Sequence, residues 1–296
     1  MNLKPALLLG ILDCGFFKPY PLQQRVLTSF LQGRDVVVQS PNRTGKKTTF
    51  ALTVLQNIDA SNSECQALIL VPFKESAQEV QRVIQTVGKF TEAKCHVSVG
   101  GTNIINDMMG LNRGRHIVVG TTGRICDMIS RRSLRTHDIK TFVMNDADEL
   151  LMRGLSDQMY EILKNLPERV QMVVAAKTIS SKVFGLMRHF MRDPVRLTIE
   201  AGVEEEKPDL SGVRQFFVTV DIKEQKLRKL CDLLTDIRAE QSVIFCNTRD
   251  EVDILVRQLR QPTVAGIHGH MHQNDRDAVF ERFHNGAFPV LVTTER

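Results

Sequence analysis

A strand, a tight turn and a helix follow one another between residues 35 and 55, and no other feature of the chain constrains its fold as strongly. The apolar run Asp35–Gln39 leads into the turn Thr44-Gly45-Lys46, and apolar residues at helical spacing come next. In such a turn the backbone N–H groups and the N-terminus of the helix can face a phosphate group. The order of these elements therefore predicts a phosphate-binding loop inside a parallel α/β domain.

Two positions of this turn depart from the pattern G-x-x-x-x-G-K-[ST]. Lys47 stands where a hydroxyl group normally ligates magnesium, and Arg43 stands where a small residue lets the backbone approach the ligand. An ammonium group has hydrogen-bond donors only, so Lys47 cannot replace the hydroxyl as a metal ligand. We therefore expect Lys46 to support nucleotide binding and the altered loop to impair hydrolysis. The alternative is a surface loop that contains Thr-Gly-Lys by chance.

Short apolar runs alternate with longer helical patterns along most of the chain. This rhythm predicts parallel sheets that are covered by helices on both faces. The strands that we expect in a first domain are Asp35–Gln39, Ala67–Val71, Cys95–Val99, His116–Gly120, Phe142–Asn145 and Met172–Ala175. The strands that we expect after it are Val213–Val220, Val243–Asn247, Val264–Ile267 and Val290–Thr293.

The segment Glu200–Leu210 interrupts this rhythm with glycine, a run of charged residues and proline, a composition that is typical of a linker. We predict a first domain over residues 1–200, a linker over 201–211 and a partial second domain over 212–296. The chain ends just after a predicted strand, so we expect the second sheet to leave an apolar edge exposed.

Composition and charge exclude some classes of protein. The chain has 296 residues and a net charge of +5, which permits a polyanionic partner. Its six cysteines are scattered without a C-x-x-C pair, which argues against a disulfide framework or a zinc site. No apolar run reaches the roughly 18 residues of a membrane span, so we expect no membrane partner. The segment Lys4–Leu12 resembles a short signal peptide, but we interpret it as a first helix that ends at Gly15.

A second polar cluster, Asn145-Asp146-Ala147-Asp148, stands at the end of a predicted strand downstream of the phosphate-binding loop. A carboxylate in this place can hold magnesium through water, and its neighbour can polarise an attacking water molecule. Acidic clusters are more often solvated turns, but the strand before this one and the loop upstream favour the second half of a nucleotide site.

These motifs and several others occur in the order found in DEAD-box RNA helicases of the initiation factor 4A family, which the chain resembles over essentially its whole length. Among its members the chain most resembles the one of the exon junction complex. The other matching segments are Gly15–Gln23, Gly100–Asn103, Arg131–Thr136, Val213–Val218 and Val243–Thr248. The resemblance implies a RecA-like P-loop domain with a parallel sheet, followed by a truncated second RecA-like domain. It also implies ATP and Mg²⁺ as cofactors, RNA as a partner and protein partners of this family.

The resemblance also assigns functional positions in this sequence. Phe16 would stack on the adenine base and Gln23 would hydrogen-bond its edge, while Asp146 and Asp148 would take the catalytic positions. The phosphates would be bound by Thr44, Gly45, Lys46 and Lys47. The positions implied for RNA contacts are Pro72, Lys74, Gly101, Thr121, Arg124, Asn247, Thr248, Gly269 and Thr294.

The departures from the family pattern concern catalysis and metal binding. Asn145 lacks the charge that would hold magnesium, and Asp146 replaces a glutamate with a side chain that is one methylene shorter. Ala176-Lys177-Thr178 stands in place of S-A-T, and the motifs that carry the arginine finger would lie beyond Arg296. We expect no intact metal site, and His268-Gly269-His270 stands where the family has H-G-D.

We therefore interpret the chain as a degenerate DEAD-box protein that binds RNA and ATP weakly, in the nucleus, the cytoplasm or both. One alternative is a working ATP-dependent RNA helicase. Another is a protein-interaction module that uses the docking surfaces of the family without either ligand.

Overall fold

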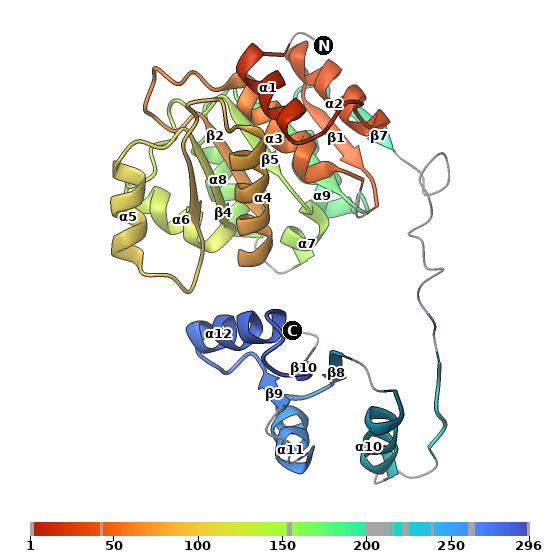
Figure 1. The fold of residues 1–296 in the computed structure, drawn as a ribbon. Helices are drawn as coiled ribbons and strands as arrows, with labels where there is room; N and C mark the ends of the chain where they lie inside the picture. The colour runs from red at the N-terminus through yellow and green to blue at the C-terminus, as the bar shows by residue number, and fades with distance from the viewer. Residues whose placement is uncertain are drawn as a thin grey trace. The chain divides into compact units, whose positions relative to one another are not determined.

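The computed structural model contains two compact units, Met1–Asp209 and Leu210–Arg296, and each is an α/β unit (Figure 1). The boundary falls within the predicted linker 201–211, which lies outside the described residues. The structure describes residues 3–41, 44–152, 156–198, 214, 216–220, 225–237, 240–259 and 264–294.

Unit 1 is built on a parallel sheet with the strand order β3-β4-β2-β5-β6-β1-β7. The strands are β1 Val36–Gln39, β2 Ala67–Val71, β3 Cys95–Ser98, β4 Ile117–Thr121, β5 Thr141–Met144, β6 Gln171–Ala176 and β7 Val195–Thr198. The helices are α1 Pro5–Asp13, α2 Pro21–Leu31, α3 Lys46–Asn57, α4 Lys74–Val87, α5 Ile104–Asn112, α6 Thr122–Ser130, α7 Ala147–Met152, α8 Ser156–Lys164 and α9 Ser181–Phe190. All six strands predicted for this domain are confirmed, with small shifts at their ends.

Strand β7 is absent from the predicted strands. It is a four-residue edge strand whose side chains alternate between half-buried and exposed, so it has no continuous apolar run. Only its pairing with β1 defines it as a strand.

Helices cover both faces of the sheet, and this explains why its central strands are continuous apolar runs. Successive side chains of a strand point to opposite faces. In β2, Ile69 and Val71 belong to one buried cluster, with α2, α3 and α4, while Leu68 and Leu70 belong to another, with α6, α7 and α8.

The predicted first helix is present as α1, and the chain turns at Gly15 with a φ of +74°. Leu7 is fully buried, and Gly10 lies so close to the carbonyl oxygen of Val87 that a Cβ would be 1.8 Å from it. The helix is therefore part of the unit 1 core. Within the described residues we find no helix with the length and apolarity that crossing a bilayer requires.

Unit 2 has a three-stranded parallel sheet with the order β8-β10-β9. Its elements are α10 Gln225–Ile237, β8 Ser242–Cys246, α11 Arg249–Leu259, β9 Val264–Ile267, α12 Gln273–His284 and β10 Val290–Thr294. The predictions for these three strands are confirmed.

The predicted strand Val213–Val220 is wrong for its described part. Residues 216–220 form no strand and pair with no other strand among the described residues. Phe217 is 93% exposed, so no layer covers this apolar run. An apolar run becomes a strand only when a neighbouring strand satisfies its backbone groups. The sequence pattern did not reveal that no strand of the described residues pairs with this run.

The described core of unit 2 is small. The apolar side chains that are buried in it are Val252, Ile267, Phe288, Val290, Leu291 and Val292. Helix α10 has no buried residue, and Val243 and Phe245 of β8 are exposed. Less apolar burial means less stabilisation, so unit 2 is expected to be the less stable unit.

We predict that limited proteolysis digests unit 2 first and leaves a resistant fragment that corresponds to unit 1. Cleavage by protease follows the population of opened states, which is larger where little apolar area is buried. Gel electrophoresis and mass spectrometry of a protease time course would identify the fragments. Equal resistance of both units would contradict the expectation.

We also predict that Asp35→Asn destabilises unit 1 by about 3 kcal/mol. The buried Asp35 carboxylate accepts hydrogen bonds of 2.8 Å from the backbone N–H groups of Met172 and Arg192, and so links β1 to β6 and to the loop before β7. An amide can accept only one of these bonds and presents donors to the other. Urea unfolding monitored by circular dichroism would measure the change.

The matched control is Asp193→Asn. Asp193 has a φ of +36°, which asparagine tolerates, and its side chain is almost fully exposed beside Arg34. The control should unfold like the wild type, because surface ion pairs contribute little. An equal loss of stability in both variants would argue against the role given to Asp35.

Candidate functional site

The carboxyl ends of the strands in unit 1 carry the residues predicted to act there. Because the strands are parallel, these ends lie along one edge of the sheet. The predicted phosphate loop and acidic cluster follow β1 and β5, which flank β6, and the RNA-contact positions follow β2, β3 and β4. The strand order therefore places the two sets side by side along this edge. We call the part formed by β5, β6 and β1 the predicted nucleotide half, and the part formed by β3, β4 and β2 the predicted RNA half.

The phosphate loop forms the entry to α3. Gly45 is the N-cap residue and has a φ of +77°, which favours glycine. Lys46 is 7% exposed, and its ammonium group donates to the carbonyl oxygens of Ser40 at 2.9 Å and Pro41 at 2.8 Å. The hydroxyl groups of Thr44 and Ser40 lie 3.1 Å apart. The loop thus holds a positive charge at a helix N-terminus, an arrangement that suits a phosphate group.

Lys47 is paired with a residue of a neighbouring helix. Its ammonium group forms an ion pair with Glu79 of α4, and both side chains are about half exposed. The residue in place of the metal-binding hydroxyl is therefore a cation that is held by a carboxylate, and it supplies no oxygen ligand. Arg43 lies outside the described residues.

Gln23 lies directly against the phosphate loop. A Cβ built on Gly45 would be 3.1 Å from Gln23 Nε2 and 3.6 Å from Cδ2 of Tyr20. The amide oxygen of Gln23 accepts a 3.0 Å hydrogen bond from the backbone N–H of Tyr20, which fixes the start of α2. Phe16 is exposed on the segment between α1 and α2. Gln23 thus lies beside Gly45, and the ring of Phe16 is accessible to solvent.

Asn145, Asp146 and Asp148 lie where β5 passes into α7. The amide nitrogen of buried Asn145 donates to the carboxylate of Asp146 at 2.9 Å. Asp146 has a φ of +53°, a left-handed conformation that is uncommon outside glycine. Among the described residues, the Oδ1 atoms of all three side chains are buried and find no hydrogen-bond partner.

These three oxygen atoms suit a hard cation such as Mg²⁺, which prefers carboxylate, carbonyl and water oxygens. Asn145 contributes a neutral amide oxygen, and α3 offers an ammonium group at Lys47. The β5–α7 side therefore offers oxygen atoms of the kind that magnesium binds, the one of Asn145 being uncharged, whereas Lys47 on the α3 side offers no ligand.

Asp148 also connects the ends of two strands. Its Oδ2 accepts a 3.2 Å hydrogen bond from the backbone N–H of Thr178, which follows β6. Lys177, the residue before it, is exposed. The backbone link between the acidic cluster and the segment after β6 is thus present with lysine at this position.

The buried carboxylate of Asp107 organises the other half of the edge. It accepts hydrogen bonds from His96, from the hydroxyl of Ser98 at 2.9 Å and from the guanidinium of Arg124 at 2.8 Å. Arg124 also donates to the backbone oxygen of Thr102 at 2.8 Å. The network therefore ties β3, α5 and α6 to the turn that follows β3.

The predicted RNA-contact residues Gly101, Thr121 and Arg124 meet at this turn. Gly101 has a φ of +80°, and the N–H of Gly100 donates to the hydroxyl of Thr121 at 3.3 Å. The side chain of Arg124 is only 9% exposed. Pro72 and Lys74 follow β2, the strand that borders the nucleotide half. Arg124 is thus committed to partners inside unit 1.

The environment of Asp107 keeps its carboxyl group ionised. Burial by itself would raise its pKa, but hydrogen bonds from His96, Arg124 and Ser98 outweigh burial and lower the pKa. A folded pKa below the unfolded value of about 3.9 stabilises the fold above that pH, and this stabilisation is lost as the pH falls through the folded pKa.

Sequence reasoning did not single out Asp107 or Glu79. The signal for Asp107 was an acidic residue in the first turn of a helix, which is common at helix N-termini. The partner of Lys47 lies on the next helix, and nothing local in the sequence indicates that pairing.

The predicted contact positions of unit 2 also share one edge. Asn247 and Thr248 follow β8, Gly269 follows β9, and Thr294 ends β10. The carboxylate of Glu251 accepts from the N–H groups of Asn247 at 3.2 Å and Thr248 at 3.4 Å, which fixes the entry to α11.

The histidines beside Gly269 have partners other than each other. Nε2 of His268 lies 3.4 Å from the carboxylate of Asp253. The ring of His270 is hydrogen-bonded to Arg249 at 2.7 Å.

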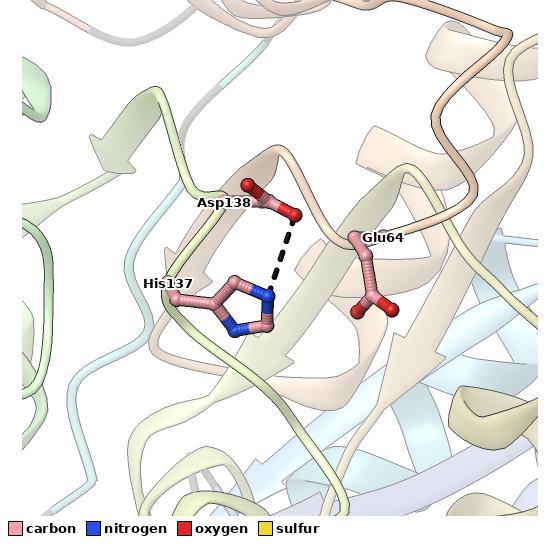
Figure 2. Close-up of side chains that lie close together, drawn as sticks. All are labelled: Glu64, His137 and Asp138. Carbon is pink, nitrogen blue, oxygen red and sulfur yellow. Dashed lines mark ion pairs between the residues drawn. The ribbon is translucent and has the colours of Figure 1, made fainter.

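Figure 2 shows a cluster of polar side chains formed by Glu64, His137 and Asp138. One ligand atom from each lies within 4.8 Å of the others, and His137 Nε2 is 3.4 Å from Asp138. These residues precede β2 and β5, whereas the candidate site follows the strands. Arg135 lies 3.4 Å from Glu64 and would compete with a cation for that carboxylate.

The chain matches models of known families over both units. Residues 20–184 match the DEAD/DEAH box helicase family, and residues 225–295 match the helicase conserved C-terminal domain. The ATP-dependent RNA helicase eIF4A of Schizosaccharomyces pombe is 44% identical over the whole chain, which covers 75% of that protein. Eukaryotic initiation factor 4A of Drosophila melanogaster is also 44% identical over the whole chain, which covers 73% of it.

Solved structures show the same architecture. Dbp5 of S. cerevisiae bound to RNA and ADP BeF3 superposes with a TM-score of 0.82 at 28% identity, over 99% of this chain and 74% of that one. A DEAD box protein from Methanococcus jannaschii gives a TM-score of 0.65 at 26% identity, over 99% of this chain and 78% of that one.

We predict that Lys46→Met weakens ADP binding at least about tenfold, because a charge-assisted contact to phosphate is lost. Lys47→Met should change the affinity by less than about twofold, because that ammonium group is engaged by exposed Glu79. Fluorescence titration with a labelled ADP would measure both constants. Equal losses in the two variants would show that Lys47 also contacts the phosphates.

Proposed function

Because this chain belongs to the DEAD-box RNA helicase family and has eIF4A relatives over its whole length, we propose that it binds RNA and ATP but hydrolyses ATP and unwinds RNA weakly or not at all. The observation that carries the proposal is the ion pair between Lys47 and Glu79. Lys47 stands where a hydroxyl group would ligate the metal, and its positive charge is already paired with Glu79.

ATP would bind at the nucleotide half of the unit 1 edge. Lys46 would exchange its bonds to the carbonyl oxygens of Ser40 and Pro41 for phosphate oxygens, and the N-terminus of α3 would add its partial positive charge. Gln23, which packs against Gly45, would read the edge of the base, and exposed Phe16 would stack on its face.

Hydrolysis would suffer from the residues that follow β5. Magnesium, when bound, supplies charge neutralisation at the phosphates; Asp146 and Asp148 would offer it charged oxygen atoms, and Asn145 only a neutral amide oxygen. A base must reach its proton within about 2.6–3.2 Å, directly or through one water, and small misplacements can cost about 100-fold. Asp146 has a side chain one methylene shorter than glutamate and a left-handed backbone, so we expect it to orient a water molecule poorly.

RNA would lie along the half of the edge formed by β2, β3 and β4. The turn Gly100–Asn103 and the start of α6 would contact the sugar-phosphate backbone without reading its sequence. The unit 2 positions Asn247, Thr248, Gly269 and Thr294 would also contact RNA. Proteins that bind relatives of the initiation factor 4A type are the partners that we expect, in the nucleus or the cytoplasm.

A second candidate function is that of a working ATP-dependent RNA helicase, the activity in the name of the fission yeast relative. The hydrogen bond between Asp148 and Thr178 favours it, because it joins the acidic cluster to the segment after β6. A third reading, a protein-interaction module that needs neither ligand, would be left if neither RNA nor ATP bound.

We predict that RNA-stimulated ATP hydrolysis by the wild-type chain stays near background. The variant that combines Lys47→Thr, Asn145→Asp and Asp146→Glu should raise it by about 100-fold, because it returns a hydroxyl ligand, a charged ligand and the longer carboxylate. A phosphate-release assay with a saturating single-stranded RNA would measure both.

The control is Glu79→Gln, which frees Lys47 without supplying an oxygen ligand at that position. It should leave ATP hydrolysis at the wild-type level. Turnover by the wild type that the triple variant does not improve would favour the working helicase instead.

A further inference from the structure

Asp107 joins three segments of unit 1 that the sequence keeps apart. His96 and Ser98 reach it from β3, Arg124 reaches it from α6, and Asp107 itself stands in the first turn of α5. Both carboxylate oxygens are used, and the residue is 4% exposed. A buried carboxylate with several charge-assisted hydrogen bonds holds its partners in one geometry.

Through Arg124, the network of Asp107 reaches the turn after β3, where predicted RNA-contact residues lie. Arg124 bridges Asp107 to Thr102, donating to the hydroxyl of Thr102 at 3.1 Å and to its backbone oxygen at 2.8 Å. Thr102 in turn donates to the backbone oxygen of Val99 at 2.8 Å. The guanidinium therefore closes the turn after β3 onto the first residues of α6.

The close packing around the network leaves it little freedom to rearrange. A Cβ on Gly110 would lie 2.5 Å from the ring of His96, and one on Gly120 would lie 2.4 Å from the backbone oxygen of Ser98. These glycines let α5 and β4 approach the two residues that hold Asp107. The arrangement of the turn is thus set by packing as well as by charge.

We propose that Asp107 is a positioning residue for RNA binding, which holds Arg124 and through it the turn Gly100–Asn103 in the form that receives the RNA backbone. In this role Arg124 acts within the protein and does not contact a phosphate group. The inference rests on the proposed RNA binding of unit 1.

This proposal predicts a change in RNA affinity that is opposite to the change expected from the charge of Asp107 alone. Removing a negative charge near a polyanion strengthens binding. If Asp107 only repelled RNA, or if its loss freed Arg124 to contact phosphate, Asp107→Asn would bind RNA more tightly. If Asp107 positions the turn, the same variant binds RNA more weakly.

The test is a fluorescence anisotropy titration of the full chain with a labelled single-stranded oligouridine, repeated over a series of salt concentrations. Asp107→Asn should weaken binding about tenfold, the equivalent of one lost charge-assisted hydrogen bond. Arg124→Gln should also weaken binding, with the slope of log affinity against log salt unchanged. A direct phosphate contact would instead reduce the slope by about 0.7.

Asp193→Asn is the matched control for net charge, because that carboxylate is exposed and lies outside the network. Ser98→Ala removes one neutral donor to Asp107 and serves if Asp107→Asn fails to fold. ADP affinity should be unchanged in each variant, since the phosphate loop lies in the other half of the edge. This readout separates loss of the RNA turn from general destabilisation.

Weaker RNA binding by Asp107→Asn or Ser98→Ala, with an unchanged salt slope and unchanged ADP affinity, would support the proposal. Binding as tight as that of Asp193→Asn, or a reduced slope in Arg124→Gln, would overturn it. A wild-type chain that binds ADP but no RNA would overturn the proposed RNA binding. That outcome differs from failure of the role given to Asp107, in which the wild type binds RNA.

Discussion

Parallel strand pairing is the constraint on which the rest of unit 1 depends. It brings every carboxyl end to one edge, and the order β3-β4-β2-β5-β6-β1-β7 divides that edge into two halves. Each predicted motif is only a few residues that follow a strand. The motifs become two neighbouring groups of residues because hydrogen bonding between strands sets their order.

Three charged side chains at this edge already have partners inside the protein. Lys46 is held by backbone oxygens, Lys47 by Glu79, and Arg124 by Asp107. These pairs differ in consequence. Bonds from Lys46 to neutral carbonyl groups can be exchanged for a phosphate group, whereas the buried pair of Arg124 and Asp107 costs several kcal/mol to break, about 3–5. The first is suited to binding, and the second to holding shape.

The two units differ in how their apolar side chains are used. In unit 1 both faces of the sheet are covered, and strands such as β2 are buried throughout. In unit 2, β8 exposes Val243 and Phe245. The same local pattern, an apolar strand followed by a helix, therefore gives a large buried core in unit 1 and a small one in unit 2. A strand is buried only where other elements pack against both faces of its sheet.

The sequence by itself determined most elements of this protein: nine of the ten strands in the described part of the chain, the predicted phosphate loop and the acidic cluster are local patterns of polarity and turn residues. Tertiary structure alone decided the partners. It made β7 a strand through β1 and joined Lys47 to Glu79 and Arg124 to Asp107. Among the described residues it gave 216–220 no pairing strand. Periodicity reports which face a residue occupies, whereas an ion pair or an edge strand depends on which distant segment lies opposite.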